Sequence, residues 1–404
     1  MTSEERSAAR RQREEQRRRE KKMERLEQIG TAEDVFSFDK MYKYGKQCCR
    51  GVNWKQSIQN FDAQLFSRTA VNRKHVLNGG KPKKLREFTL NERGKTRNIE
   101  APHVDDRQVQ KTVTKEVLLP MYLPQLIYDN GASLKGKGLH FSQRLLDQRL
   151  REHKKRYGMN GYVIVADFKG FFPNADRNVI KQMHQDIPDP KLRGILDSIT
   201  DLGRGDKGLP LGVEPSQAEM IALPSKLDSY MTCQVGLRGY GHYMDDYYML
   251  VPPDRDPKEI LRIFTEKAAE YGITISESKT RIVPFGKPFK FCKMKRIFDG
   301  DRIIHRGSRD SLKRARRKIK KFARTEMKYS DIYTSLQSTF AYFERTDDHN
   351  TILKLRRLFY ANFGFEFNIE EFRKRGMDEL YMPPEIQEGG SEREGTSDPS
   401  QNKS

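Results

Sequence analysis

The sequence lacks the features of a membrane-spanning, secreted or disulfide-stapled protein. Its 404 residues include only four cysteines, and the adjacent pair Cys48 and Cys49 fits neither a disulfide framework nor a zinc pattern. No run approaches the roughly 18 apolar residues that a spanning helix needs. The longest, residues 117–127, is interrupted by two prolines. The N-terminus is charged and has no apolar signal segment. We therefore expect a reduced, cytoplasmic protein with no membrane partner.

Acidic residues are also scarce relative to basic ones. The chain has 77 Lys and Arg against 56 Asp and Glu, a formal net charge of +21. Such an excess favours a polyanionic partner, and nucleic acid is the default because Lys and Arg release counterions condensed on phosphates. The alternative is a highly charged surface that serves solubility alone. With 22 Phe and 17 Tyr, the chain has enough large apolar residues to exclude a fully disordered protein.

Both ends of the sequence differ in composition from the middle. Residues 1–28 form one charged run, for which we expect a solvated or fraying helix that orders on RNA or a partner. The Gly-, Ser- and Glu-rich tail after Pro384 is expected to be disordered. The globular middle contains no internal repeat.

The hydrophobic pattern of the middle predicts an α+β fold with a basic helical appendage from Ser308 onward. The elements expected in it are a hairpin over 84–101 with its turn at 91–94, a buried strand over 162–168, a helix over 177–200, a strand–turn–strand over 242–251 and a helix over 257–271.

Three aspartates carry the strongest chemical signal. Asp245 and Asp246 lie between two aromatic, strand-forming runs, and Asp167 ends the expected buried strand. An Asp pair alone is most often a solvated turn. A third carboxylate beside it favours divalent metals, since like charges raise each other's pKa and a cation relieves the conflict. Two metals about 3.5–4 Å apart would clamp an in-line phosphoryl transfer. The oxygen ligands suit two Mg²⁺ ions, or Mn²⁺.

The segments YMDD at 243–246 and DFKGFF at 167–172 resemble those of reverse transcriptases, and the resemblance extends over about residues 84–350 in the family's motif order. It implies a right-hand polymerase fold with fingers, a palm built on an antiparallel sheet, and a helical thumb. The expected division is a charged N-terminal arm (1–30), an N-terminal extension with fingers (31–160), a palm with a fingers insertion (161–298), a basic helical thumb (299–384) and a disordered tail (385–404).

The resemblance also assigns the catalytic roles. It implies that Asp167, Asp245, Asp246 and the backbone carbonyl of Phe168 hold the metals. Lys279 in ISESKT resembles a family lysine that would protonate the departing pyrophosphate. By itself, a lone Lys there is more simply a solvated side chain. The same hairpin would bring Tyr243 and Met244 to the nucleic acid.

Further residues resemble the family's nucleotide site. Phe172 matches the aromatic gate that excludes a 2′-hydroxyl, although the residue by itself is better explained as a core aromatic. Lys95 and Arg97 match the cations of the fingers hairpin, where an ordinary charged turn is the alternative. The loop and helix start at 208–217 match motif B, and its Leu211, Gly212 and Gln217 would lie beside the nascent base pair.

Basic residues provide the expected nucleic-acid contacts. Arg107 lies in the family-like DDRQVQ segment and Lys135 and Lys137 lie in a glycine-rich one. Seven of the eleven residues 311–321 are basic, and an apolar stripe runs beside them. A thumb helix would turn its cations to duplex phosphates, while a solvated helix is the alternative. The cations we assign there are Lys313, Arg316, Arg317 and Lys320.

Motif B departs from the commonest family pattern. Leu211 replaces a Gln and Gln217 replaces a Pro, a combination similar to the reverse transcriptases of diversity-generating retroelements. Losing a polar side chain over the incoming sugar predicts low fidelity. Antiphage-defence and retron-like enzymes remain alternatives, as do a noncatalytic RNA-binding protein on a polymerase scaffold and a two-metal nuclease. We find no RNase H-like or HNH-like run, and expect an RNA template, a DNA or RNA primer, dNTPs and a small accessory protein as partners.

Overall fold

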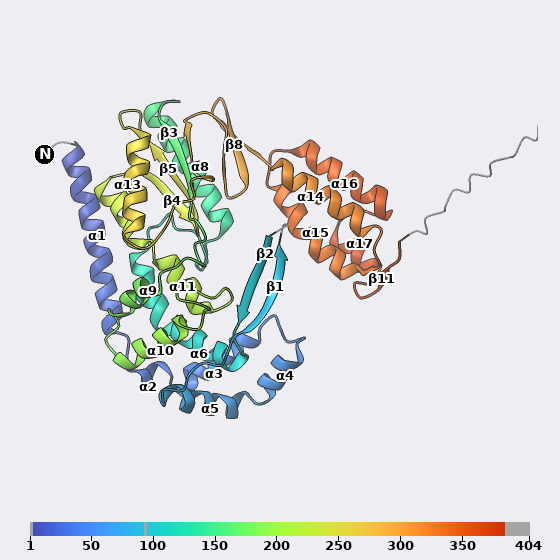
Figure 1. Ribbon diagram of the computed structural model, residues 1–404. Coiled ribbons are helices and arrows are strands. Elements are labelled where there is room, and N and C mark those ends of the chain that lie inside the picture. The colour runs from blue at the N-terminus through green and yellow to red at the C-terminus, as the bar shows by residue number, and fades with distance from the viewer. Residues whose placement is uncertain (1–2, 93–94, 384–404) are drawn as a thin grey trace, which may run out of the picture. The chain divides into compact units, whose positions relative to one another are not determined.

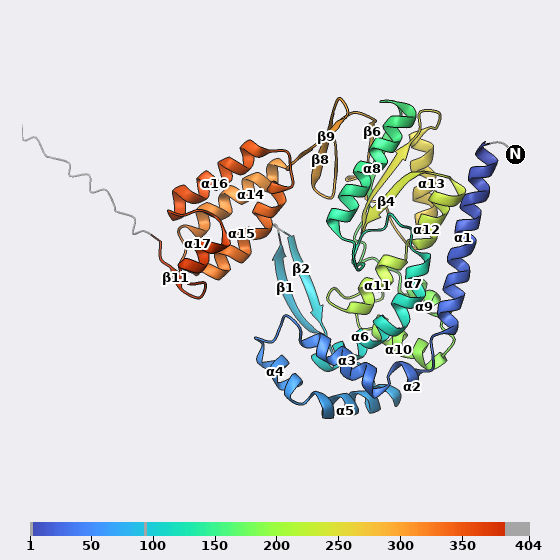
Figure 2. The same ribbon diagram turned by 180° about the vertical axis from the view of Figure 1, so that it is seen from behind.

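The computed structural model describes residues 3–92 and 95–383, apart from the side chains of residues 3, 4, 92 and 95. The chain divides into two compact units, residues 1–292 and 293–404, which are described in turn (Figures 1 and 2). Among the described residues, none of the helices is both long enough and apolar enough to cross a membrane.

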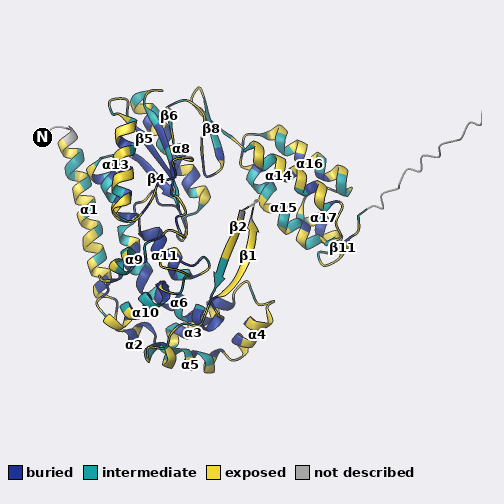
Figure 3. Ribbon diagram, in the orientation of Figure 1, coloured by how far each residue is buried: buried dark blue, intermediate teal, exposed yellow. Residues whose placement is uncertain are grey.

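A four-stranded antiparallel sheet in the order β4-β5-β3-β6 forms the centre of the first unit. Alternate residues of a strand face opposite sides. Ile164 belongs to the core cluster that contains Phe264 of α13, whereas Val163, equally buried, points to the other side. Helix α8 contacts β4 and β5. Figure 3 shows β4 and β5 as mostly buried. The bounds are β3 Tyr162–Asp167, β4 Gly239–Tyr243, β5 Asp246–Val251, β6 Arg281–Pro284, α8 Leu139–Tyr157 and α13 Pro257–Ala269.

The same unit also contains a second core cluster, a smaller one around Phe61, and the β1–β2 hairpin. The hairpin, β1 Arg86–Glu92 with β2 Lys95–Ala101, confirms the expected one, although turn residues 93–94 lie outside the described residues. The remaining elements are α2 Ala32–Val35, α3 Phe38–Cys49, α4 Gln56–Ala63, α5 Leu65–Leu77, α6 Val104–Val113, a π-helix Thr114–Leu118, α7 Leu119–Tyr122, a 3₁₀ turn Leu123–Gln125, α11 Glu214–Ala222, α12 Ser225–Ser229, a π-helix Tyr230–Gln234 and β7 Phe289–Phe291.

The single helix expected over 177–200 is wrong. The structure has two helices, α9 Arg177–His184 and α10 Pro190–Thr200. Asp189 caps α10 by accepting hydrogen bonds from the backbone N–H groups of Lys191 and Leu192. Pro188 and Pro190 explain the break, because proline has no N–H to continue a helix and disfavours helical geometry in the residue before it.

The N-terminal helix packs against the body of its unit rather than standing free in solvent as expected. Helix α1, Ser3–Glu27, places Arg11, Arg18 and Lys22 on one face, because they are spaced seven and four residues apart. Arg11 Nε donates to the Cys233 carbonyl at 3.2 Å, and Arg18 contacts the Cys233 sulfur at 3.1 Å. Lys22 pairs with Asp186. Local composition showed the charges but not the partners that the fold supplies.

The second unit is a helical bundle with an aromatic core and a β8–β9 hairpin. Ser308 caps α14 by accepting a hydrogen bond from Ser311 N–H at 3.1 Å. Ala315 and Ile319 face the core. Its elements are β8 Met294–Asp299, β9 Arg302–Arg306, α14 Arg309–Phe322, β10 Met327–Lys328, α15 Tyr329–Glu344, α16 His349–Phe363, α17 Ile369–Lys374 and β11 Leu380–Tyr381.

Candidate active site

The sheet brings the three aspartates to one edge. Asp167 ends β3 and pairs in register with Asp246, the first residue of β5. Asp245 lies in the two-residue turn between β4 and β5, and its carbonyl accepts a hydrogen bond from Phe168 N–H at 3.2 Å. Asp167 and Asp246, 79 positions apart in the chain, are therefore neighbours because adjacent antiparallel strands place them opposite each other.

Burial and mutual repulsion dominate the electrostatics of this edge. Burial, together with the charges of Asp245 and Asp167, raises the pKa of Asp246 to about 6. Burial and the charge of Asp167 also raise the pKa of Asp245. The charge of Arg97 acts in the opposite direction on Asp245, so the predicted hairpin cation influences the carboxylate edge.

Lys279 supplies a positive charge within the site. Its ammonium group donates to Asp167 Oδ1 at 2.5 Å. Burial disfavours the charge on Lys279, but the hydrogen bond to Asp167 and the negative charges of all three aspartates outweigh it and raise the Lys279 pKa. The lysine is therefore held protonated beside the carboxylates, as a proton donor must be.

The donor set fits hard divalent cations. The raised pKa values show that the aspartates oppose one another's charge, and a bound cation would relieve that repulsion. Across the described residues, no three His, Cys, Asp or Glu side chains already form a closed metal cluster. In this structure the Oδ1 atom of Asp167 is paired with the Lys279 ammonium group.

Two of the three phenylalanines that follow Asp167, Phe168 and Phe172, are predicted site residues. Phe168 is buried, and its ring packs on Tyr247 and Phe264 while its backbone bridges to Ile275. Phe172 is half-buried, packs against the core cluster, and its carbonyl accepts a hydrogen bond from Leu209 N–H. The structure thus makes Phe168 a core residue and leaves Phe172 partly exposed. The roles of the Phe168 carbonyl and the Phe172 ring stay predictions.

The motif B loop lies directly on strand β2. The Leu211 carbonyl accepts a hydrogen bond from Glu100 N–H at 3.0 Å. Gly212 has a φ of +116°, and a Cβ there would lie 2.9 Å from the Glu100 carbonyl oxygen. Glycine is therefore required by both backbone conformation and space. This contact couples the loop to the hairpin that bears Arg97.

A cavity of about 310 Å³ beside this loop collects three of the predicted residues. Arg107 of α6, Gly212 and Gln217 of α11 line it together with Ser133. Gln217 is exposed and Arg107 is half-buried, so their polar groups are accessible. The structure thus joins the family-like DDRQVQ segment to motif B, which the sequence could not do.

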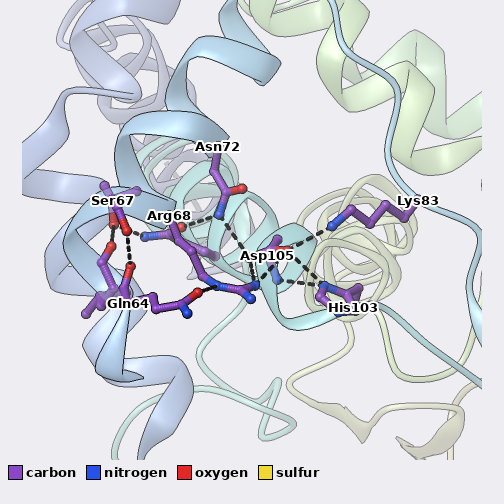
Figure 4. A network of polar contacts seen from close by, with 10 residues as sticks. Gln64, Ser67, Arg68, Asn72, Lys83, His103 and Asp105 are labelled. Atoms are coloured by element: carbon purple, nitrogen blue, oxygen red, sulfur yellow. Dashed lines mark hydrogen bonds and ion pairs between the residues drawn. The ribbon is translucent and has the colours of Figure 1, made fainter. Parts of the chain in front are cut away.

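A polar network that the sequence analysis missed anchors the base of the hairpin. Asp105 is buried and pairs with Lys83 at 2.8 Å, just before β1, and with Arg68 of α5 at 3.1 Å (Figure 4). It also contacts His103, which follows β2. Burial opposes its charge, but Lys83 and Arg68 outweigh that effect and lower the Asp105 pKa. The neighbouring Arg107 had drawn attention to this segment, but nothing in the sequence identified Asp105's partners.

The other predicted contacts lie in different settings. Lys135 is exposed. Lys137 instead donates to the carbonyls of Tyr128 and Asn130 at 2.7 and 3.0 Å, so its ammonium group braces the loop. Burial lowers the Lys137 pKa. The side chain of Lys95 lies outside the described residues. Tyr243 and Met244 are half-buried at the aspartate turn.

In the second unit, the predicted thumb cations are all exposed on α14. The four are Lys313, Arg316, Arg317 and Lys320. Nearby Lys318 differs, because its ammonium group donates to the Ser335 carbonyl at 2.5 Å and burial lowers its pKa. The helix therefore has an apolar face toward the bundle and a face of solvated cations opposite.

The antiparallel sheet, its aspartate edge and the hairpin beside it define a polymerase palm with fingers. Residues 81–295, more than half of the chain, match the family model "Reverse transcriptase (RNA-dependent DNA polymerase)". The chain therefore belongs to the reverse transcriptase family. It is an RNA-directed DNA polymerase, a nucleotidyltransferase that acts on a nucleic acid template, a primer and dNTPs. A search of curated proteins gave no match. The predicted family and α+β class are confirmed.

Proposed function

We propose that the enzyme extends a primer on an RNA template with two Mg²⁺ ions held by Asp167, Asp245 and Asp246. The observation that carries this proposal is the placement of the three carboxylates at one sheet edge, where burial and mutual repulsion raise the pKa of Asp245 and Asp246. When bound, such ions stabilise the attacking and leaving oxygens of an in-line phosphoryl transfer.

The chain's own residues prepare the reacting groups. The primer 3′-hydroxyl gives its proton to water as its oxygen bonds to the α-phosphorus of the dNTP. The bond from that phosphorus to the oxygen that bridges to the β-phosphate breaks. Lys279, held protonated beside Asp167, gives its proton to the departing pyrophosphate. The Phe172 ring excludes a 2′-hydroxyl, and Arg97 offsets charge on the triphosphate.

We also propose a low-fidelity role in a diversity-generating retroelement. Leu211 is half-buried and offers no polar group from its side chain, and Gln217 faces the cavity shared with Arg107. Nascent base-pair geometry is then checked by fewer hydrogen bonds. We propose that a small accessory protein is a further partner of the enzyme.

The test is primer extension on a mixed-sequence RNA template with Mg²⁺ and dNTPs, followed by product sequencing. Misincorporation concentrated opposite template adenines supports the diversity-generating role. A product copied without such errors would still support polymerase activity. It would contradict the low fidelity inferred from Leu211 and favour a retron-like or defence role.

A separate pair of substitutions tests the assignment of the aspartates as metal ligands. Asp245→Asn with Asp246→Asn is expected to abolish synthesis, a loss of about 10³-fold or more, because removing the charge removes the cation sites. RNA binding measured by filter retention should persist. Synthesis by the double variant would contradict the assignment.

A further inference from the structure

A buried His–Asp pair lies directly behind the turn that bears Asp245. His242 on β4 and Asp228 on α12 are 1% and 0% exposed. Asp228 Oδ2 lies 3.0 Å from His242 Nε2, while its other oxygen accepts a hydrogen bond from the Tyr240 hydroxyl at 2.7 Å. The second ring nitrogen, His242 Nδ1, lies 3.0 Å from the carbonyl oxygen of Met244. A chain of contacts therefore runs from α12 through the ring to the residue before Asp245.

The chemistry of the partners defines the direction of these hydrogen bonds. A carbonyl oxygen only accepts, so Nδ1 of His242 carries a hydrogen and donates it to Met244. Nε2 faces a carboxylate, and one proton lies between them. The ring also stacks on Tyr247, with centroids 4.4 Å apart and planes 3° apart. Asp228 and Tyr247 together hold the imidazole in the orientation that the Met244 hydrogen bond needs.

Met244 has the strained backbone conformation in this turn. Its φ is +55°, in the left-handed region that residues with a Cβ rarely adopt. The backbone of His242 is itself anchored on the side away from β5. Its N–H donates to the Asp129 carbonyl, and its carbonyl accepts from Gly131 N–H, both at 3.2 Å. A strained peptide is thus tied to a rigid, buried support.

We propose that His242, oriented by Asp228, is a positioning residue for the catalytic turn. Because Asp245 and Asp246 directly follow Met244, a rotation of the Met244 peptide would move both carboxylates relative to Asp167. The hydrogen bond from Nδ1 opposes that rotation. This inference rests on the proposed role of these aspartates as metal ligands, and it assigns His242 to their placement, not to dNTP binding.

Two substitutions of His242 separate the two ring nitrogens. In His242→Asn the amide nitrogen takes the place of Nδ1 and keeps a donor for the Met244 carbonyl. In His242→Gln it takes the place of Nε2, keeps the contact with Asp228 and loses that donor. Replacing a residue that orients a metal ligand typically costs about 10–100-fold. We expect a kcat loss in this range for His242→Gln and only about threefold for His242→Asn, with the dNTP KM changed less than kcat in both.

A readout besides activity is Mn²⁺ binding to the enzyme–primer–template complex, followed by electron paramagnetic resonance. The affinity should fall about tenfold in His242→Gln and remain near the unmodified value in His242→Asn. Thermal unfolding should not separate the two variants. Equal kcat and equal Mn²⁺ affinity in both would overturn the proposal and leave His242 a core residue.

Substitutions of Asp228 give an independent test should the His242 variants fold poorly. The amide of Asp228→Asn still accepts from Tyr240 and donates to Nε2, so Nδ1 keeps its hydrogen and most activity is retained. Asp228→Leu loses the orienting group, and its kcat and Mn²⁺ affinity should follow His242→Gln. Equal values for the two Asp228 variants would overturn the proposal.

The same variants distinguish a failure of the positioning role from a failure of the metal assignment. If Asp245→Asn with Asp246→Asn is inactive while His242→Gln behaves like His242→Asn, only the positioning role is wrong. If the double aspartate variant remains active, the metal assignment itself is wrong.

Discussion

At the scale of single residues, the three aspartates at the sheet edge destabilise the folded protein because their charges repel one another in a partly buried setting. Asp246 is packed beside two other aspartates in a setting that raises its pKa from 3.8 to about 6. Such a residue is costly in the fold unless a cation accompanies it. Lys279 supplies one positive charge through Asp167, and in the proposed mechanism a bound metal relieves the remaining repulsion.

Asp246→Asn should therefore stabilise the metal-free protein. Since the folded pKa is raised, the ionised carboxylate is penalised in the fold, and stability is lost as pH rises from about 4 through about 6. Removing the charge should increase the free energy of unfolding by up to about 3 kcal/mol at neutral pH, and by nothing below the unfolded pKa. Urea unfolding in a chelator at several pH values measures this. The exposed control Asp254→Asn should show no such gain; equal stability of Asp246→Asn and the unmodified protein at every pH would contradict the argument.

At the scale of elements, the site depends on a few contacts between segments distant in sequence. The motif B loop contacts β2 at Gly212, and three helices meet at His184. Such junctions hold together segments that are far apart in the chain.

Gly212→Ala should displace the motif B loop. The new Cβ meets the Glu100 carbonyl oxygen at 2.9 Å, and the φ of +116° is strained for alanine. We expect a stability loss of about 1–3 kcal/mol and a clear rise in the dNTP KM, measured by thermal unfolding and steady-state extension. The matched control is Gly194→Ala within α10, where a Cβ meets nothing within 4 Å. It should be stabilising by about 0.5–1 kcal/mol. Similar behaviour of the two variants would show that the loop tolerates displacement.

The junction of α9, α10 and α11 should make stability pH-dependent. Buried His184 contacts Asp197 at 2.8 Å and Glu219 at 3.2 Å. Burial opposes its charge, but the two carboxylates outweigh burial and raise the His184 pKa. The stabilisation is full below the ordinary value of 6.5 and is lost as pH rises through the raised pKa.

Replacing His184 by Gln should remove this pH dependence and cost about 2 kcal/mol at acidic pH, the scale of hydrogen bonds to charged groups. Urea unfolding at acidic and alkaline pH measures both effects, and exposed His349→Gln serves as control. An unchanged pH profile in His184→Gln would assign the dependence to other groups.

At the scale of the whole molecule, the net charge of +21 is distributed among sites with different uses. Some cations already bind groups of the protein itself, such as Lys137 and Lys318, whose ammonium groups donate to backbone carbonyls. Others are solvated, as on α14. Only the second kind is available to release counterions from nucleic acid.

Replacing Lys313, Arg316, Arg317 and Lys320 together by Gln should weaken binding to an RNA–DNA duplex and flatten its salt dependence. Each lost phosphate contact reduces the slope of log K against log salt by about 0.9, so four contacts give a reduction of about 3–4. Fluorescence anisotropy at several salt concentrations provides the measurement. Lys318→Gln, which removes a cation already bound to the protein, should leave the slope nearly unchanged. An unaltered slope in the quadruple variant would exclude α14 from the duplex interface.

Local signals were sufficient for much of this molecule. The strand ending at Asp167, the turn carrying Asp245 and the Ser308 cap were predictable, because alternation, turn geometry and capping act over a few neighbouring residues. The helix over 177–200 was wrong, although Pro188 and Pro190 marked the break. The apolar pattern on both sides of the prolines masked it.

The tertiary structure alone decided which distant side chains meet. The packing of α1 on Cys233, the pairing of Asp105 with Arg68 and the hold of Asp228 on His242 join residues that no periodicity relates. The type of each residue indicates only that it is charged or polar, not which residue it contacts. Whether a charged side chain is solvated, braces a loop or positions a catalytic turn depends on burial and on the partner that the fold brings within hydrogen-bond distance.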